Sequence, residues 1–225
     1  LQEALGEAEQ NGTVHAVVLM GGGGMGFSAG ADLHESKAIT SAAKAVEMAE
    51  MEIAFSEAVC RFPKPLIAAI DRYALGGGCE LALAADWRIA SSRAKLGFPE
   101  AKLGAFPAGG AMPLTIGLLG RQRTRQLMLR GELLTATEAF ELGLVDKVVS
   151  HETLLDEALR LACTFDERPY GSVRAIKALT REDMWAMRDA VIGWMRTLYS
   201  GGDLPEGLRA FLEKRTPQFN RDWLA

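Results

Sequence analysis

The sequence predicts an α/β fold followed by a helical tail, and three observations carry that prediction. Short apolar runs typical of buried strands recur between residues 14 and 149, where glycine-rich turns separate them from helical segments. After Arg168-Pro169, every segment has a helical pattern. The chain has 225 residues, of which 48% are hydrophobic, and this is enough for one large core. We therefore expect an α/β core over residues 1–167 and a helical region over residues 168–225.

The first part of the chain alternates helices with buried strands. Asn11-Gly12 ends a helix over residues 1–10, and the apolar run Val14–Met20 follows as a strand. An apolar face predicts one long helix over Ser41–Phe62. Pro63-Lys64-Pro65 ends that helix because proline cannot continue the helical hydrogen bonds. Leu66–Ile70 is then a second buried strand.

The later segments continue this alternation before the helical tail begins. Thr135 or Thr137 caps a helix over Glu138–Leu142, and Gly143 ends it. The other expected strands are Trp87–Ala90, Ala94–Phe98 and Leu144–Val149, and the other expected helices are 80–85, 111–119, 121–130, 151–166, 171–182, 183–199 and 206–214.

Composition excludes several classes of protein. A net charge of −4 without a basic cluster argues against nucleic-acid binding. The three cysteines lack metal or disulfide spacing, which favours a reducing compartment. No apolar run reaches the length of a membrane span, and the acidic N-terminus is unlike a signal peptide. We expect a cytoplasmic protein, with the mitochondrial matrix as the alternative. Because the chain starts in mid-helix without Met, we also expect an upstream segment.

The stretch Tyr73–Leu81 contains the most informative motif. Gly76-Gly77-Gly78 leaves backbone N–H groups open to a ligand. Helix-forming residues follow, and a helix N-terminus favours an oxygen that gains negative charge. The motif therefore predicts a turn that holds a carbonyl oxygen, with Glu80 in the first turn of the helix. A plain strand-to-helix turn is the alternative.

Glu100 is a second candidate carboxyl group. Its apolar neighbours Leu96, Phe98 and Leu103 predict a hydrophobic surrounding. Burial raises the pKa of a carboxyl group, and a second carboxyl nearby raises it further, so one of a pair can keep its proton at neutral pH. The spacing alone leaves open whether Glu80 and Glu100 meet, and an exposed loop acid is the alternative.

Residues 21–30 match two short motifs whose required contexts are missing. G-x-G-x-x-G at Gly21, Gly23 and Gly26 is typical of dinucleotide binding, but a helix does not follow at once. G-x-S-x-G around Ser28 is typical of a nucleophile elbow, but glycines stand where a strand should lead into the serine, and His151 is the only late histidine. A third interpretation makes this loop a second donor of backbone N–H groups, paired with the Gly76–Gly78 turn.

A longer pattern runs through nearly the whole chain. It consists of Phe27–Leu33, Pro65–Ile70, Tyr73–Leu81, Asp86, Phe98-Pro99-Glu100, Gly104, Pro107, Gly109-Gly110, Ala139, Leu142–Val145, Glu206-Gly207 and Phe211–Arg215. This ordered pattern resembles the crotonase superfamily, and within it the closest similarity is to enoyl-CoA hydratase. The resemblance removes the case for either short glycine motif.

The resemblance implies a crotonase-like spiral of repeated β-β-α units that holds an acyl-CoA thioester. It assigns the thioester oxyanion hole to the backbone N–H groups of Ala31 and Gly77, and it sets Glu80 and Glu100 beside a water molecule. Glu80 would activate the water as general base, and protonated Glu100 would protonate C2. The implied reaction adds water across the C2–C3 double bond of a trans-2-enoyl-CoA. No cofactor is expected, because coenzyme A is part of the substrate.

The resemblance also implies contacts with CoA and a mode of assembly. Family positions that bind the substrate match Ala29, Asp32, Leu33, His34 and Leu75. The tail positions Phe211 and Lys214 match residues that reach the adenine end of CoA, often across a subunit interface. A homotrimer, or a hexamer of two trimers, is therefore expected, with no nucleic-acid or membrane partner.

Two departures from the family pattern keep alternatives open. The family's first strand and its basic loop are missing, so contacts to the CoA phosphates have no assignment. The loop Pro107–Gly110 is one residue shorter than the usual P-G-A-G-G, which leaves the acyl preference, and even the reaction, open. An enoyl-CoA isomerase, moving a proton between C2 and C4, is the alternative within the fold. A serine hydrolase that uses Ser28 and a non-catalytic acyl-CoA-binding protein are the alternatives from other classes.

Overall fold

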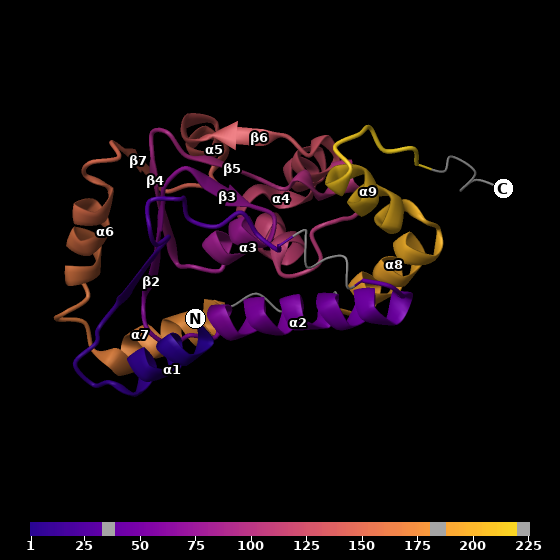
Figure 1. Cartoon of the computed structure of the whole chain (residues 1–225). Coiled ribbons are helices and arrows are strands. Elements are labelled where there is room, and N and C mark those ends of the chain that lie inside the picture. Colours follow the sequence, from indigo (N-terminus) through magenta and orange to yellow (C-terminus); the bar gives the residue numbers. More distant parts are fainter. Residues whose placement is uncertain (33–38, 181–187, 220–225) are drawn as a thin grey trace.

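The computed structural model describes residues 1–32, 39–180 and 188–219, and it alternates strands with helices before ending in a helical tail (Figure 1). The first part contains α1 (Gln2–Gln10), β1 (Val17–Met20), α2 (Ala42–Cys60), β2 (Leu66–Ile70), β3 (Tyr73–Leu75), α3 (Gly77–Leu83), β4 (Trp87–Ser91), β5 (Lys95–Gly97), the 3₁₀ helix η2 (Pro99–Leu103), α4 (Ala111–Arg130), β6 (Leu133–Thr135), α5 (Ala136–Leu142), β7 (Lys147–Val149) and α6 (Leu154–Cys163). The tail contains α7 (Tyr170–Thr180), α8 (Arg188–Ser200) and α9 (Asp203–Leu212). The predicted α/β fold with a mostly helical C-terminal region is confirmed.

The strands form two sheets that the chain visits in turn. One sheet is parallel throughout, in the order β1-β2-β4-β7. The other has the order β3-β5-β6, in which β3 and β5 are parallel and β6 is antiparallel to β5. The consecutive pairs β2–β3 and β4–β5 each give one strand to each sheet. Ser28, after β1, forms a parallel bridge with Ala74 of β3, so the first unit follows the same course.

Strand β2 is buried on both faces, as its continuous apolar sequence predicts for a parallel strand. Leu66, Ala68 and Ile70 belong to the main core, which also contains residues of α3 and α4. Ile67 and Ala69 face the opposite way and pack with α6. The end of β2 is therefore fixed between two layers, and this fixes the position of the β3–α3 turn that follows.

The helical tail folds back onto the core (Figure 1). α8 packs along α2, where Ala49 and Ile53 share a cluster with Val191 and Ile192. α9 packs on η2. Lys177 of α7 forms an ion pair with Asp86 and donates a 2.9 Å hydrogen bond to the Lys64 carbonyl oxygen. The tail is thus held at several places on the core.

Several short elements differ from the sequence expectations. Tyr73–Leu75 forms β3, although the sequence indicated only a turn, because pairing with β5 supplies its hydrogen bonds. β6 was not predicted, since its three residues carry no strand pattern and are ordered by pairing with β5. The last strand covers only Lys147–Val149 of the predicted 144–149. The predicted boundary near residue 120 is confirmed as a break inside α4, where Gly120 leaves helical geometry with φ 73° and ψ 163°.

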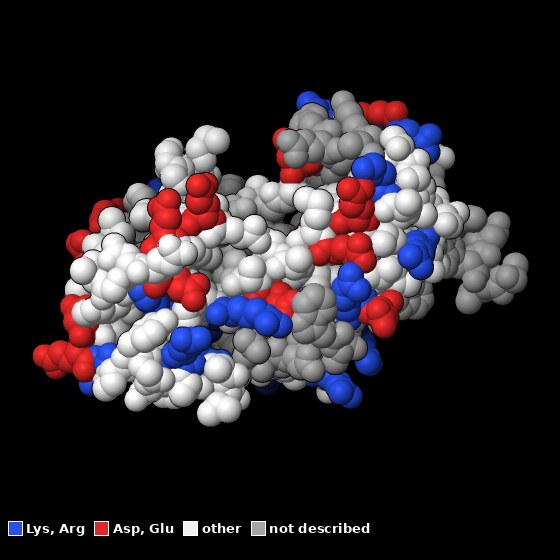
Figure 2. Space-filling view, turned by 90° about the horizontal axis from the view of Figure 1, so that it is seen from below, with Lys and Arg blue, Asp and Glu red and all other residues white. Residues whose placement is uncertain are grey.

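The surface charges and the helix lengths bear on the class of protein. On the face seen in Figure 2, acidic and basic side chains are interspersed. Within residues 1–32, 39–180 and 188–219, no helix is long and apolar enough to cross a membrane.

Candidate active site

A cavity lies between the core and the tail. α2, α3 and η2 line it on the core side, and α8 and α9 line it on the tail side. The space between its walls is about 860 Å³ when the open mouth is included. Its apolar walls come from Ile39, Met48, Phe106, Met195, Leu204 and Leu208.

Two glycine-containing turns meet beside this cavity. A Cβ atom on Gly30 would lie 2.7 Å from the Leu75 carbonyl oxygen and 3.1 Å from the Gly77 nitrogen, so only glycine permits this close approach. Ala31 and Gly77 consequently line the same cavity. Gly77 is the first residue of α3, and its N–H has no acceptor within the helix. The two N–H donors assigned from the family pattern are thereby brought to one place.

Glu80, in the first turn of α3, lines the cavity and is only 4% exposed. Its carboxylate accepts hydrogen bonds from the backbone N–H groups of Gly109 (3.3 Å) and Gly110 (3.2 Å), at the start of α4. A Cβ atom on Gly109 would overlap Glu80 Oε2. The shortened Pro107–Gly110 loop therefore still supplies the donors that hold this carboxylate.

Glu100 comes from η2, which Pro99 begins. Its Oε1 lies 2.7 Å from the position that a Cβ on Gly76 would occupy, so Gly76 makes room for it. Gly76 has φ 53° and ψ −124°, a backbone conformation that favours glycine. Glu100 Oε2 is buried and has no hydrogen-bond partner in the part of the chain that the structure describes.

The two carboxyl groups share a cavity but differ in their surroundings. Burial raises the pKa of Glu80 to about 7, although the N–H groups of Gly110, Gly109 and Ala111 favour its ionised form. Burial, followed by the charge of Glu80, raises the pKa of Glu100 to about 7. Interacting carboxyls lose their protons as a pair. Near neutral pH the pair can therefore hold one proton, and the backbone donors favour Glu80 as the ionised member.

Sequence reasoning missed a third carboxyl group in this cavity, that of Glu52 on α2. Burial raises its pKa to about 8, and the charges of Glu80 and Glu100 add to the effect. The signal that could have revealed it is helical spacing. Glu52 lies on the same stripe of α2 as Ala45, Ala49 and Ser56, all of which are buried.

The remaining predicted substrate-binding residues have different positions. Ala29 lines the cavity. Leu75 ends β3 and contributes the carbonyl oxygen against which Gly30 packs. Asp32 is exposed, just beyond Ala31. Leu33 and His34 lie outside the described residues.

The two predicted tail residues stand apart from the cavity. Phe211, near the end of α9, is 48% exposed, and Lys214 follows the helix with φ 54°. Neither lines the cavity. Their predicted contact with the adenine end of CoA stays a prediction.

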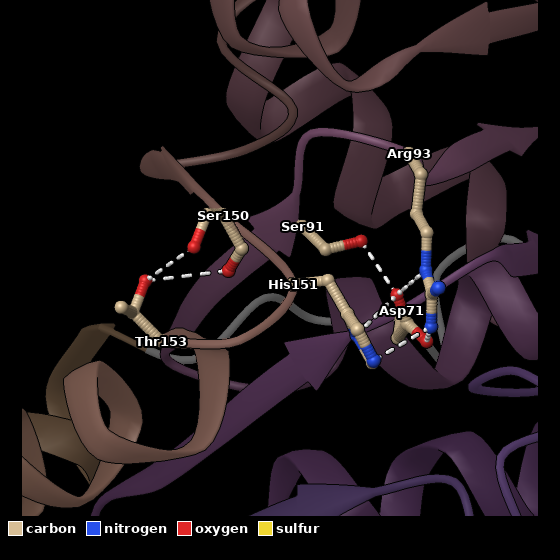
Figure 3. A network of polar contacts seen from close by, with 6 residues as sticks. All are labelled: Asp71, Ser91, Arg93, Ser150, His151 and Thr153. Carbon is tan, nitrogen blue, oxygen red and sulfur yellow. Dashed lines mark hydrogen bonds and ion pairs between the residues drawn. The ribbon is translucent and has the colours of Figure 1, made fainter.

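The serine-hydrolase alternative lacks its geometry. Ser28 Oγ accepts a hydrogen bond from the Gly30 N–H at 3.2 Å. His151 instead lies in a separate polar cluster with Asp71, Ser91 and Arg93 (Figure 3). No hydrogen bond joins Ser28 to His151 among the described residues.

That polar cluster, which we call the Asp71 cluster, forms where β2, β4 and β7 end (Figure 3). Asp71 accepts bonds from Ser91 Oγ (2.7 Å) and from Arg93 Nε and Nη2 (2.8 and 2.6 Å), and His151 Nδ1 lies 3.3 Å away. The Arg93 guanidinium holds the pKa of Asp71 well below its usual range.

The dinucleotide interpretation also lacks its geometry. Residues 21–32, which contain Gly21, Gly23 and Gly26, form turns without a helix. Within the described ranges, no group of three or more His, Cys, Asp or Glu residues is placed to hold a metal ion.

Comparison with known proteins identifies the family. The model of the enoyl-CoA hydratase/isomerase family matches residues 1–222. The chain belongs to this family. A crotonyl-CoA hydratase from Syntrophomonas wolfei subsp. wolfei is 34% identical over 223 residues, which cover 97% of this chain and 85% of the relative.

Solved structures of other members of the enoyl-CoA hydratase/isomerase family share the fold. The enoyl-CoA hydratase from Bacillus anthracis superimposes with a TM-score of 0.74 at 35% identity, covering 97% of this chain and 86% of its own. The carnitinyl-CoA hydratase from Mycobacterium avium superimposes with a TM-score of 0.82 at 35% identity and the same two coverages. These similarities confirm the crotonase fold and support hydratase activity for this member of the family.

Proposed function

We propose that the cavity adds water across the C2–C3 double bond of trans-2-enoyl-CoA thioesters. The observation that carries the proposal is the pair of buried carboxyl groups, Glu80 and Glu100, with unequal hydrogen bonding. The backbone N–H groups of the loop before α4 favour a carboxylate at Glu80, whereas Glu100 has only its own backbone N–H and keeps one buried oxygen without a partner among the described residues, which favours the protonated acid. An ionised base and a neutral acid in one cavity are what hydration requires.

In the proposed reaction, Glu80 takes a proton from water as the water oxygen bonds to C3. The electron pair of the double bond moves toward the thioester, whose oxygen gains negative charge. The N–H groups of Ala31 and Gly77 stabilise that charge, and such donors are each worth about 3–4 kcal/mol in other enzymes. Glu100 then gives its proton to C2. The product is a 3-hydroxyacyl-CoA, and the proton on Glu80 returns to Glu100 through solvent. No cofactor takes part in these steps.

We assign the CoA portion of the substrate to the surface that continues from Ala29 and Asp32. Leu33, His34 and Leu75 complete the proposed substrate positions. Phe211 and Lys214 are assigned to the adenine end, within a homotrimer or a hexamer of two trimers. The exposed ring of Phe211 supports an external contact of this kind. Sedimentation velocity tests the assembly, and Lys214→Ala tests the contact through a higher KM for the acyl-CoA.

The boundary between the proposed core, residues 1–167, and the tail, residues 168–225, has a functional meaning. Met195, Leu204 and Leu208 line the cavity from the tail, so the tail completes the substrate site. We propose that the two regions act as one catalytic unit.

The decisive experiment follows the loss of enoyl-thioester absorbance with crotonyl-CoA. Glu80→Gln and Glu100→Gln should each lower kcat by about 10²–10⁴-fold, since each removes one proton-transfer group. Glu47→Gln is a matched control on an exposed part of α2, where Glu47 pairs with Lys44. No hydration by the native protein, or full activity in both cavity variants, would overturn the proposal.

The same assay separates the alternatives. An isomerase would convert trans-3-hexenoyl-CoA into the 2-enoyl form without adding water. A binding protein would bind crotonyl-CoA and leave it unchanged. Two carboxyl groups, rather than one, favour hydration over isomerisation.

A further inference from the structure

Glu52 is a cavity carboxyl group that the proposed proton transfers do not use. It lies on α2, between two differently built parts of the cavity. Ser56, four residues later, has its Oγ 3.3 Å from the position of a Cβ on Gly109, beside the backbone groups that hold Glu80. Met48, four residues earlier, belongs to the apolar wall. One helical turn of about 5.4 Å separates Glu52 from each neighbour, so it lies between the acid–base pair and the apolar end.

Among the described residues, no protein group pairs with the carboxyl of Glu52, which has neither an ion pair nor a hydrogen bond there. Phe106, Met195 and Leu208, which line the same cavity, are apolar, and the described lining contains no Lys, Arg or His. A polar group enclosed without a partner is costly, and the cost disappears when a ligand supplies the partner.

The chemistry of the missing partner follows from the charges around it. The cavity contains three carboxyl groups, those of Glu52, Glu80 and Glu100, and no basic wall residue among those described. A carboxylate on the acyl chain would meet three carboxyl groups and no cationic side chain of the described lining. A hydroxyl or an ammonium group would instead donate a hydrogen bond to an oxygen of the Glu52 carboxyl, and an ammonium group would also favour its ionised form.

We propose that Glu52 is a specificity-determining residue that binds a hydrogen-bond donor, a hydroxyl or an ammonium group, carried by the acyl chain beyond C3. The raised pKa of Glu52 fits a group that is neutral in the empty cavity and ionises beside a cation. This proposal rests on the hydratase function, because it concerns which enoyl-CoA thioesters that site accepts.

The test compares kcat/KM among six-carbon trans-2-enoyl-CoA substrates of matched size. One series carries a hydroxyl at C4, C5 or C6, a second carries an ammonium group at those positions, a third ends in a carboxylate, and hexenoyl-CoA is the plain reference. The native protein should prefer a donor-bearing chain over the carboxylate. A preference for hydroxyl indicates a neutral hydrogen bond, whereas a preference for ammonium indicates an ion pair.

Variants then assign the preference to Glu52. Glu52→Leu should lower the ratio of donor-bearing to plain substrate by about 10–100-fold, the equivalent of one hydrogen bond to a charged or buried group. Glu52→Gln should keep part of a hydroxyl preference and lose an ammonium preference. Glu47→Gln, on the exposed face of the same helix, should leave the ratio as in the native protein.

Three results would overturn or relocate the inference. An equal ratio in the native protein and Glu52→Leu would exclude a selective role. Loss of hydration for every substrate in Glu52→Gln, with its thermal unfolding intact, would place Glu52 in the proton-transfer chemistry instead. If the native protein hydrates none of the substrates, the hydratase function itself fails, which is a different outcome from failure of selectivity.

Discussion

Carboxyl groups occupy two contrasting regions of this molecule, the cavity and the Asp71 cluster. In the cavity, Glu52, Glu80 and Glu100 have no cationic partner among the residues that the structure describes, and burial raises the pKa of each. In the Asp71 cluster, a guanidinium and a hydroxyl surround one carboxylate and lower its pKa. The carboxyl groups of the cavity can therefore exchange protons near neutral pH, whereas the carboxylate of the Asp71 cluster stays ionised.

This contrast suits proton transfer in the cavity and structural support in the Asp71 cluster. A group that exchanges protons near neutral pH must have surroundings that make neither state strongly preferred. The Asp71 cluster has the opposite property, because two bonds from Arg93 favour only the charged state. It connects the ends of three parallel strands, and it does so outside the cavity.

The largest effect should come from Gly109→Ala, which alters the cavity side of the comparison. The added Cβ would overlap Glu80 Oε2, so the carboxylate must leave the N–H groups that hold it. Because a displacement of about 1 Å at a catalytic group can cost about 10²-fold in rate, hydration of crotonyl-CoA should fall by about that factor.

Gly6→Ala is the matched control for that substitution. Gly6 lies within α1, where an added Cβ meets no atom within 4 Å, and alanine should stabilise the helix by about 0.5–1 kcal/mol without affecting the rate. Equal rates for Gly109→Ala and the native protein would contradict the assigned position of Glu80.

The next effect concerns the pH dependence of kcat/KM. Since the pKa values of Glu80 and Glu100 are each raised to about 7, the profile should be bell-shaped with its maximum near pH 7. Activity falls on the acid side as the base gains a proton and on the alkaline side as the acid loses one, by about tenfold per pH unit. A profile that is flat from pH 5 to 9 would show that the pair does not control the reaction.

A smaller effect is expected from Asp71→Asn, which alters the scaffold side. The substitution removes hydrogen bonds from Ser91 and Arg93 to a charged acceptor and should lower the free energy of unfolding by about 1–3 kcal/mol at pH 7. The folded-state pKa lies below the unfolded value, so the native advantage is present above about pH 4 and is lost in more acidic solution. Urea unfolding at pH 7 and at pH 3 measures this, and a difference that grows in acid would reverse the assigned sign.

The last effect, on stability alone, is the pH-dependent gain in stability of Glu52→Gln. The pKa of Glu52 is raised to about 8 in the folded state, so its contribution to stability is fully present below the unfolded value of about 4.5 and is lost as the pH rises through 8. Gln lacks this loss, so the Tm advantage of the variant should increase between pH 5 and 9, by about 2–4 °C for each kcal/mol. Thermal scans across this range test it, and a Tm difference that is independent of pH would refute the raised pKa.

Residues with strong local signals could be predicted from the sequence. The apolar run Leu66–Ile70 indicated a strand buried on both faces, and Gly120 marked the break within α4. The three glycines before Glu80 indicated a bare turn at a helix start, which is how β3 meets α3. In each case the physical cause lies within a few neighbouring residues.

Features that depend on distant partners could not be predicted in this way. β6 forms because it pairs with β5, where Leu134 lies opposite Leu96. The three residues of β6 carry no pattern that predicts this pairing. The meeting of Glu80 with the Gly109 and Gly110 N–H groups depends on how α4 packs against α3. Glu52 could not be recognised as a cavity residue from its helix alone, because α8 and α9, far along the chain, supply the opposite wall of the cavity.

The origin of the cavity walls has a consequence for how this protein can change during evolution. Glu80 and Glu100, the proposed acid–base pair, lie in the core, whereas Met195, Leu204 and Leu208 lie in the tail, more than ninety positions later. Mutations that enlarge or narrow the acyl compartment can therefore accumulate in one stretch of the gene without touching the acid–base pair. The acyl-chain specificity of such an enzyme can therefore change during evolution while the proposed reaction stays the same.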